Sequence, residues 1–347
     1  VLFVLLSLVW VRPALADDPA ASVAPAPSGV AVDAEGDVYV TDYALDRVVK
    51  FGADGSVLTQ WGGSGSAQGQ FNAPFGVAVD STDTVFVVDQ LNNRLQRFAT
   101  DGTVLGAWGG PGAGAGELRT PFGVAVGGGH VYVADFGNDR VDVFSTDGSP
   151  VLSFGRRGSG DGQFQRPAGI AVAPDGAVYV ADHFNDRIQH FGADGKFVAQ
   201  LGTGQAAVVA TPTLATTLNA AATATATLAA SVSAPAMAAL AVAPGSAAPD
   251  SQLRRPEGIA VDHDGNLWVA DYGRDRIVKF APDGRLLLSW GSRGSGPGEF
   301  LGPKGVAIDP SSGRIYVADT GNSRVQRVAP DGTLEASWPM PPPPSAS

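Results

Sequence analysis

The sequence contains no cysteine. This absence excludes disulfide bonds, thiolate metal sites and a cysteine nucleophile, so the stability of the chain must come from packing. Charged residues are also scarce, at 16% of 347 residues, and basic residues are the rarer kind: 23 Lys and Arg against 34 Asp and Glu give a formal net charge of -11. A protein that binds a phosphate backbone is expected to carry a positive domain charge, so we expect no nucleic-acid partner.

Turn-forming residues are abundant, with 46 glycines and 25 prolines. They separate short apolar runs, as in residues 167–195, PAGIAVAPDGAVYVADHFNDRIQHFGADG. Runs of this length, rich in Val, Ile and Tyr and interrupted by Asp-Gly turns, are typical of antiparallel strands joined by hairpins. The stretch is therefore predicted to be a small meander.

The same unit occurs six times. The copies begin at Pro27, Pro74, Pro121, Pro167, Pro256 and Pro303, and a further strand follows each meander. A period in the mid-forties with four strands per unit is typical of a β-propeller blade. The sequence thus predicts an all-β fold, a six-bladed β-propeller of four-stranded antiparallel blades over residues 27–338. Because neither end offers a spare strand, blade 6 is expected to close against blade 1 by side-chain packing alone.

The copies PAGIAVAPDGAVYVADHFNDRIQHFGADG, PEGIAVDHDGNLWVADYGRDRIVKFAPDG and PKGVAIDPSSGRIYVADTGNSRVQRVAPDG resemble NHL repeats. The resemblance covers roughly residues 27–338 and implies a six-bladed propeller. Members of the NHL-repeat family include extracellular sensor domains of bacterial receptor kinases, RNA-binding domains and a few lyases with histidine-bound metal. The resemblance therefore predicts the fold much more sharply than the function.

The segments outside the repeats carry separate predictions. Residues 1–16 resemble a signal peptide whose positive n-region is missing, which places the propeller in a secreted or cell-envelope location. The alternative is the end of a transmembrane helix, an uncleaved anchor that would make the chain a membrane-receptor ectodomain. Residues 17–26 are predicted to be a linker. Residues 205–249 form a low-complexity Ala/Thr-rich insertion between blades 4 and 5, predicted to be disordered, and residues 339–347 form a Pro-rich tail with no packing demand.

Two sets of polar residues invite a catalytic interpretation. Each blade has an Asp and an Arg five residues apart across the middle hairpin, and six copies of such a pair favour a structural role over a catalytic one. The four histidines, His130, His183, His190 and His263, are not expected to converge on one point, as a zinc site requires. We therefore predict no catalytic residue, no metal site and no cofactor.

The positions that differ between blades are the candidates for recognition. They are the residue inside each Pro-x-Gly and the residue after the strand-2 Asp, which should both approach the central mouth. The candidate ligand-binding residues are Tyr43, Phe75, Gln90, Phe122, Phe136, His183, Glu257, Tyr272, Lys304 and Thr320. Exposed aromatic rings beside a few polar groups suit a peptide, glycan or protein ligand. The sequence thus favours an exported, non-enzymatic binding or sensing module.

Two alternatives remain open from the sequence. One is a metal-dependent propeller lyase or hydrolase. The other concerns the mouth itself, where Phe75 and Phe122 could simply plug the channel.

Overall fold

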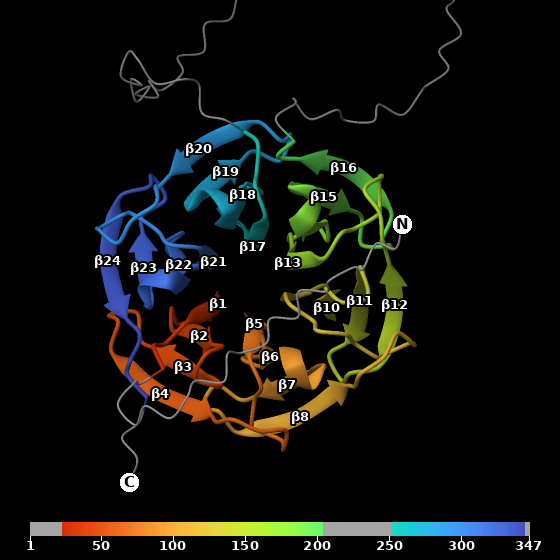
Figure 1. The fold of residues 1–347 in the computed structure, drawn as a ribbon, viewed down its shortest axis with the longest axis horizontal. Coiled ribbons are helices and arrows are strands. Elements are labelled where there is room, and N and C mark those ends of the chain that lie inside the picture. Colours follow the sequence, from red (N-terminus) through yellow and green to blue (C-terminus); the bar gives the residue numbers. More distant parts are fainter. Residues whose placement is uncertain (1–22, 204–250, 344–347) are drawn as a thin grey trace, which may run out of the picture.

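The computed structural model describes residues 23–203 and 251–343, which form six four-stranded antiparallel sheets arranged around one axis (Figure 1). The predicted six-bladed propeller is confirmed. The segment 204–250 lies between blades 4 and 5, as expected of the insertion, but it falls outside the described residues. So do the predicted signal peptide, most of the linker and the last four residues of the tail. No described helix is long and apolar enough to span a membrane.

The first three blades follow the chain from the axis outward. Blade 1 contains β1 (Pro27–Val32), β2 (Val38–Asp42), β3 (Arg47–Phe51) and β4 (Val57–Gly62). Blade 2 contains β5 (Pro74–Val79), β6 (Val85–Asp89), β7 (Arg94–Phe98) and β8 (Val104–Gly109). Blade 3 contains β9 (Val124–Gly127), β10 (His130–Asp135), β11 (Arg140–Ser145) and β12 (Pro150–Phe154). Its first strand begins three residues later than the expected Pro121.

The other three blades repeat the same order. Blade 4 contains β13 (Pro167–Val172), β14 (Val178–Asp182), β15 (Arg187–Phe191) and β16 (Phe197–Leu201). Blade 5 contains β17 (Pro256–Val261), β18 (Leu267–Asp271), β19 (Arg276–Phe280) and β20 (Leu286–Trp290). Blade 6 contains β21 (Pro303–Ile308), β22 (Ile315–Asp319), β23 (Arg324–Val328) and β24 (Leu334–Pro339). Single 3-10 turns link the second and third strands in four blades: η1 (Gln90–Asn92), η2 (His183–Asn185), η3 (Tyr272–Arg274) and η4 (Thr320–Asn322).

The hydrophobic core lies between blades instead of within them. Six apolar clusters occur among the described residues, and each joins two adjacent blades. The second strands are buried along their whole length in β2, β6, β14, β18 and β22, because both of their faces are covered by neighbouring sheets. No blade can bury its apolar surface alone, so the ring must form as a unit.

The first strands approach each other most closely at the glycine of each Pro-x-Gly. A Cβ atom on Gly76 would stand 2.6 Å from the carbonyl oxygen of Phe122 in the next blade, and the Gly76 N–H donates to that same oxygen at 2.9 Å. The glycine of every other blade faces a backbone carbonyl of its neighbour in the same way: Gly29, Gly123, Gly169, Gly258 and Gly305. Only glycine fits at this position.

The Asp and Arg pairs hold the turns at one end of the blades, as expected. The Arg Nε lies 2.7 to 3.5 Å from the Asp Oδ2 in all six blades, with the Asp side chain fully buried: Asp42/Arg47, Asp89/Arg94, Asp135/Arg140, Asp182/Arg187, Asp271/Arg276 and Asp319/Arg324. The guanidinium then reaches the glycine-rich connection to the same blade. Arg94, for example, donates to the carbonyls of Ser66, Ala67 and Gln70. The pairs are structural.

Ring closure confirms one expectation and corrects another. Among residues 23–203 and 251–343, no strand is exchanged between blades 6 and 1, and the two blades share an apolar cluster like every other adjacent pair. The tail, however, does pack. Met340 is 5% exposed in that cluster, its N–H donates to Ser323 O at 2.9 Å, and Arg47 donates to the carbonyls of Pro341 and Pro342. At the junction of blades 6 and 1, the tail thus supplies Arg47 with carbonyls like those that the connections supply to the other arginines.

The axial glycines give a first prediction. Gly76→Ala should lower the free energy of unfolding by about 3 kcal/mol, because the new Cβ meets backbone atoms that cannot move aside. Chemical denaturation measures this change. The control is Gly160→Ala, whose Cβ would meet only the Gln163 side chain at 3.4 Å. Equal stability of the two variants would contradict the close packing at the axis.

The tail gives a second prediction. Met340→Ala should cost about 2 kcal/mol of unfolding free energy, since it removes a buried side chain from the cluster that joins blades 6 and 1. Leu58→Ala is the control, because Leu58 is 53% exposed on β4. A Met340→Ala variant as stable as the Leu58→Ala variant would show that the tail plays no part in closure.

Candidate functional site

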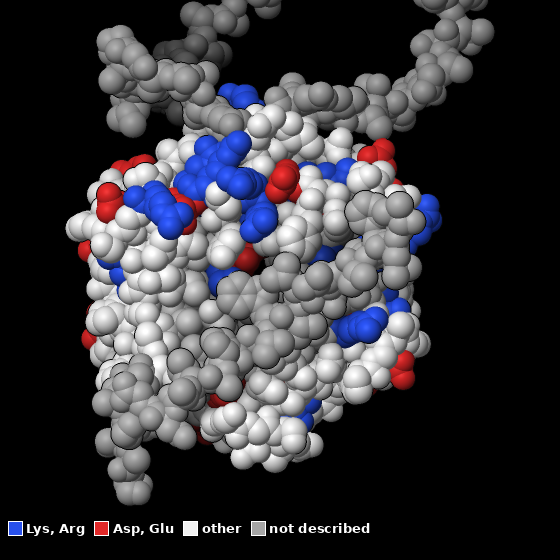
Figure 2. All heavy atoms as spheres, viewed as in Figure 1, with Lys and Arg blue, Asp and Glu red and all other residues white. Residues whose placement is uncertain are grey.

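The candidate site lies at the end of the propeller that carries the η turns and the connections between blades, here called the mouth face. The strand directions bring two kinds of residue to its centre. The residue inside Pro-x-Gly reaches it from the first strand, and the residue after the strand-2 Asp reaches it from the turn. Figure 2 views the propeller from this side.

Aromatic side chains from five blades form a continuous row around the mouth. Ring centroids are 6.4 Å apart for Tyr43 and Phe75, 3.9 Å for Phe75 and Phe122, and 4.5 Å for Phe122 and Phe136, the last pair stacked. The row continues through His183, 6.4 Å from Phe136 and 6.5 Å from Tyr272. All of these rings except that of His183 are half-buried, so part of each apolar surface faces solvent.

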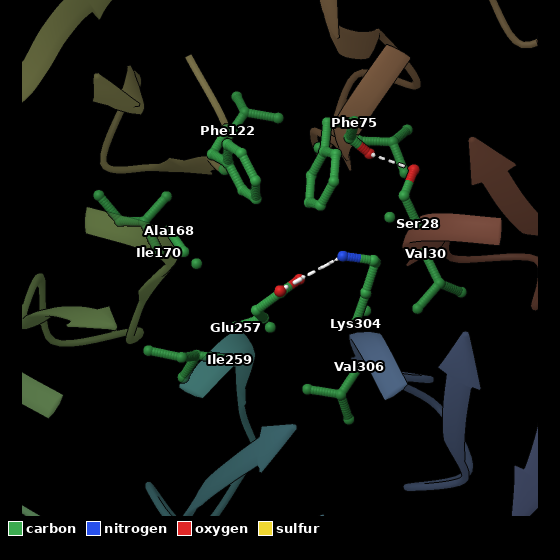
Figure 3. Close-up of a pocket in the computed structure, with 18 residues that line it drawn as sticks. Ser28, Val30, Phe75, Phe122, Ala168, Ile170, Glu257, Ile259, Lys304 and Val306 are labelled. Carbon is green, nitrogen blue, oxygen red and sulfur yellow. Dashed lines mark hydrogen bonds and ion pairs between the residues drawn. The ribbon is translucent and has the colours of Figure 1, made fainter. Parts of the chain in front are cut away.

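Lys304 and Glu257 form an ion pair at the mouth, between the two ends of the aromatic row. The Lys304 Nζ lies 3.3 Å from both Glu257 carboxylate oxygens (Figure 3). It also lies over the rings of Tyr272 and Phe75, at 4.7 and 5.2 Å from their centroids. Burial works to lower the pKa of Lys304, but the Glu257 carboxylate together with Tyr272 and Tyr43 outweighs burial and raises the pKa. The ammonium group therefore stays charged and held by two rings and one carboxylate.

His183 is a neutral member of the row. Its side chain is 8% exposed, and burial lowers its pKa below the usual value. The Nδ1 atom lies 3.2 Å from Pro256 O, and because a carbonyl only accepts, Nδ1 carries the proton. His183 thus links blade 4 to blade 5 across the mouth.

Two of the predicted residues are not brought into the row. The Thr320 hydroxyl donates to Pro27 O at 2.6 Å and is buried between blades 6 and 1. Gln90 lies half-buried in η1. The other eight candidates, Tyr43, Phe75, Phe122, Phe136, His183, Glu257, Tyr272 and Lys304, surround the mouth together.

The channel below the mouth is narrow. The cavity between the first strands measures about 60 Å³, and its lining includes Phe75, Phe122, Glu257 and Lys304. In Figure 3 the Phe75 and Phe122 rings point toward the axis and toward each other. The two phenylalanines thus narrow the channel, as one alternative predicted, and they also contribute half-buried surface to the mouth. This geometry suits a ligand that lies across the mouth more than one that threads the channel.

Sequence reasoning missed the arginines next to this row. The Arg166 guanidinium lies 5.2 Å from the Phe136 centroid, and that of Arg255 lies 5.9 Å from the centroid of Phe184, a ring that is 45% exposed. Both arginines immediately precede the proline that opens a blade, a position that varies between copies and could have been read from the repeat. Figure 2 shows basic side chains gathered on this face over blade 5.

Blade 3 departs from the repeated polar cluster. In blades 2, 4 and 6 a buried Gln donates to the Asp of the pair, as Gln96 Nε2 does to Asp89 Oδ2 at 3.1 Å. Blade 3 has Asp142 at that position, and Arg140 Nε lies 2.8 Å from Asp142 but 3.5 Å from Asp135. Burial, reinforced by the Asp142 carboxylate, raises the pKa of Asp135 to about 7.

Within the described residues, no group of three or more His, Cys, Asp or Glu side chains could hold a metal ion. The four histidines lie apart in the fold: His183 at the mouth, His190 in β15, His130 at the start of β10 and His263 in the β17–β18 hairpin.

Comparison with known proteins agrees with this architecture. The family model "NHL repeat" matches residues 164–191, 253–280 and 300–328, which fall in blades 4, 5 and 6. This six-bladed β-propeller contains NHL repeats in its last three blades. The other three blades share the same strand order and the same Asp and Arg pair.

Proteins similar to this propeller include enzymes. A stretch of 63 residues is 38% identical to peptidylglycine alpha-amidating monooxygenase of Rattus norvegicus, which is 17% of this chain and only 6% of that protein. Virginiamycin B lyase from Staphylococcus aureus aligns over 91% of this chain and 84% of its own, with a TM-score of 0.55 and 15% identity. A gluconolactonase from Xanthomonas campestris aligns over 86% and 84%, with a TM-score of 0.54 and 18% identity. At these identities the structural likeness shows the fold alone.

The buried carboxylate pair gives a prediction about pH. A folded-state pKa of about 7 for Asp135, against 3.8 ordinarily, means that the folded protein holds a proton that the unfolded chain releases. The stability linked to that proton is present below about pH 4 and is lost as the pH rises through 7. Asp142→Gln should reduce this dependence, because it removes the neighbouring carboxylate and supplies the amide donor that blades 2, 4 and 6 have at this position.

Relative to wild type, the Asp142→Gln variant should therefore gain about 1 kcal/mol of unfolding free energy as the pH rises from 5 to 8. Urea unfolding across this range measures the gain, and Asp147→Asn on the exposed β11–β12 hairpin is the control. A stability difference that does not change with pH would contradict the raised pKa of Asp135.

Proposed function

We propose that this propeller is a secreted or cell-envelope binding or sensing module without turnover. It recognises a peptide, glycan or protein ligand with the mouth face. The main support is the continuous row of half-buried aromatic rings around an embedded Lys304 and Glu257 pair. Half-buried rings with a few fixed polar groups between them are typical of ligand sites, since the rings give apolar contact and the polar groups give orientation.

The repeat supports the same proposal. The axial glycines and the Asp and Arg pairs serve the scaffold and are nearly the same in every blade. The residues beside them vary in chemistry from blade to blade, and these residues surround the mouth. In repeat proteins the binding surface is commonly built from such variable positions. If the chain is the ectodomain of a membrane receptor, the same face would serve as its sensor.

A metal-dependent lyase or hydrolase is the alternative. Elemental analysis of the purified protein separates the two ideas, because such an enzyme would hold a transition metal in stoichiometric amount. A bound metal of that kind would favour the enzyme over the binding module.

The proposed mouth site predicts the effect of removing its rings. A Phe75→Ala, Phe122→Ala, Tyr272→Ala triple variant should lose at least about tenfold in affinity for ligands that a screen of peptides and cell-envelope glycans identifies, because aromatic anchors dominate contact energy. The matched control is Leu58→Ala, Leu105→Ala, Leu287→Ala, whose side chains are 53%, 46% and 42% exposed on outer strands.

Circular dichroism checks that the triple variant folds, and the single variants Tyr43→Ala and Tyr272→Ala replace it if it does not. Binding that is unchanged in the folded mouth variants would reject this face. The proposal also fails if the outer-strand control loses affinity equally.

A further inference from the structure

The charge of the molecule is divided unevenly between its two faces. On the face opposite the mouth, the hairpin between the third and fourth strands of every blade carries an aspartate: Asp54, Asp101, Asp147, Asp194, Asp283 and Asp331. The hairpins between the first and second strands add more carboxylates, so acidic side chains outnumber basic ones there. The net charge of -11 therefore belongs mainly to that face.

The mouth face carries an arc of arginines on one side. We call Arg119, Arg156, Arg157, Arg166, Arg254 and Arg255 the arginine arc. They come from the connections that lead into blades 3, 4 and 5, and all but the half-buried Arg166 are exposed. The connection into blade 2, residues 62–73, has no charged residue, so the arc occupies only part of the circle.

The arc is not neutralised by ion pairs within the described residues. Two nearby carboxylates bind backbone amides instead: Asp139 Oδ1 accepts the Arg166 N–H at 2.8 Å, and Asp186 Oδ1 accepts the Arg255 N–H at 2.7 Å. These bonds join neighbouring blades. The guanidinium groups of the arc are exposed except that of Arg166, which is half-buried and donates from Nη1 to Phe136 O at 3.3 Å; the exposed Asp161 lies in the same connection as Arg156 and Arg157. Basic groups on a mouth opposite an acidic face set up a field that draws anions toward the mouth.

Two arc arginines are already oriented for recognition. Arg166 lies over Phe136, a member of the aromatic row, and Arg255 lies over the exposed ring of Phe184. Arg166 uses one N–H group for Phe136 O, and the other N–H groups of the two guanidiniums suit a planar carboxylate. Carboxylate-binding and apolar-binding groups thus alternate along one side of the mouth.

We propose that the ligand of the mouth face is an acidic peptide segment in which Asp or Glu residues are interspersed with apolar ones. Its carboxylates pair with the arginine arc, and its apolar side chains lie on the aromatic row. This inference rests on the proposed function and narrows it to one class of ligand. The protein's own net charge would oppose such a ligand at any other face.

The test uses a fluorescent peptide of alternating Glu and Leu, with a peptide of alternating Lys and Leu as the control of opposite charge. All variants are made in the full-length protein. Arg254→Gln, Arg255→Gln removes two charges of the arc, and only the backbone atoms of these residues bond inside the fold. Lys196→Gln, Arg285→Gln removes the same charge from exposed positions on the opposite face.

The acidic peptide should bind wild type, bind more weakly at high salt, and lose about tenfold in affinity with the arc variant but not with the control variant. The Lys and Leu peptide should not bind. Equal loss with both variants, or preference for polygalacturonate or single-stranded RNA over the peptide, would overturn the inference.

Failure of this inference can be told apart from failure of the proposed function. If neutral peptides or glycans bind and the aromatic variants abolish that binding while the arc variant does not, the mouth face stays a binding site and only the acidic class is wrong.

Discussion

Close approach of the six first strands at the axis determines where this protein can interact with other molecules. At the glycine of each Pro-x-Gly, the backbone of one blade lies against a carbonyl of the next, with no room for a side chain. The channel is consequently reduced to a cavity of about 60 Å³. The residue beside each glycine is then directed to the mouth, so the constraint that closes the channel also creates the candidate site.

The mouth face has a repeated layer and a variable layer. The repeated layer consists of the buried Asp, its Arg and the connection carbonyls, and it fixes the turns in all six blades. The variable layer lies above it and ranges from Phe122 in blade 3 to Lys304 in blade 6. Because the buried Asp and Arg pairs fix the turns, the side chains above them can differ without loss of stability of the fold. Blade 3 is the exception, since Asp142 places a second buried carboxylate beside Asp135.

Much of the fold was predictable from the sequence, because each blade repeats the same Pro-x-Gly, Asp, Arg and Asp-Gly positions. The ring of eight mouth residues was predictable for the same reason. The packing of the tail was not, since a Pro-rich composition gives no sign that Arg47 needs carbonyl partners until the ring is closed. The burial of Thr320 was not predictable either, because its hydroxyl bond to Pro27 O depends on the junction between blades 6 and 1.

The account is tested most directly by hydrogen exchange of the backbone amides, compared between the ligand-free protein and the protein saturated with whichever ligand a screen identifies. The amides of the η turns and of the connections between blades should become more protected, while those of the opposite hairpins and outer strands stay unchanged. Protection concentrated on the hairpins between the third and fourth strands, or along β4, β8 and β20, would contradict the claim that the mouth face is the site of recognition.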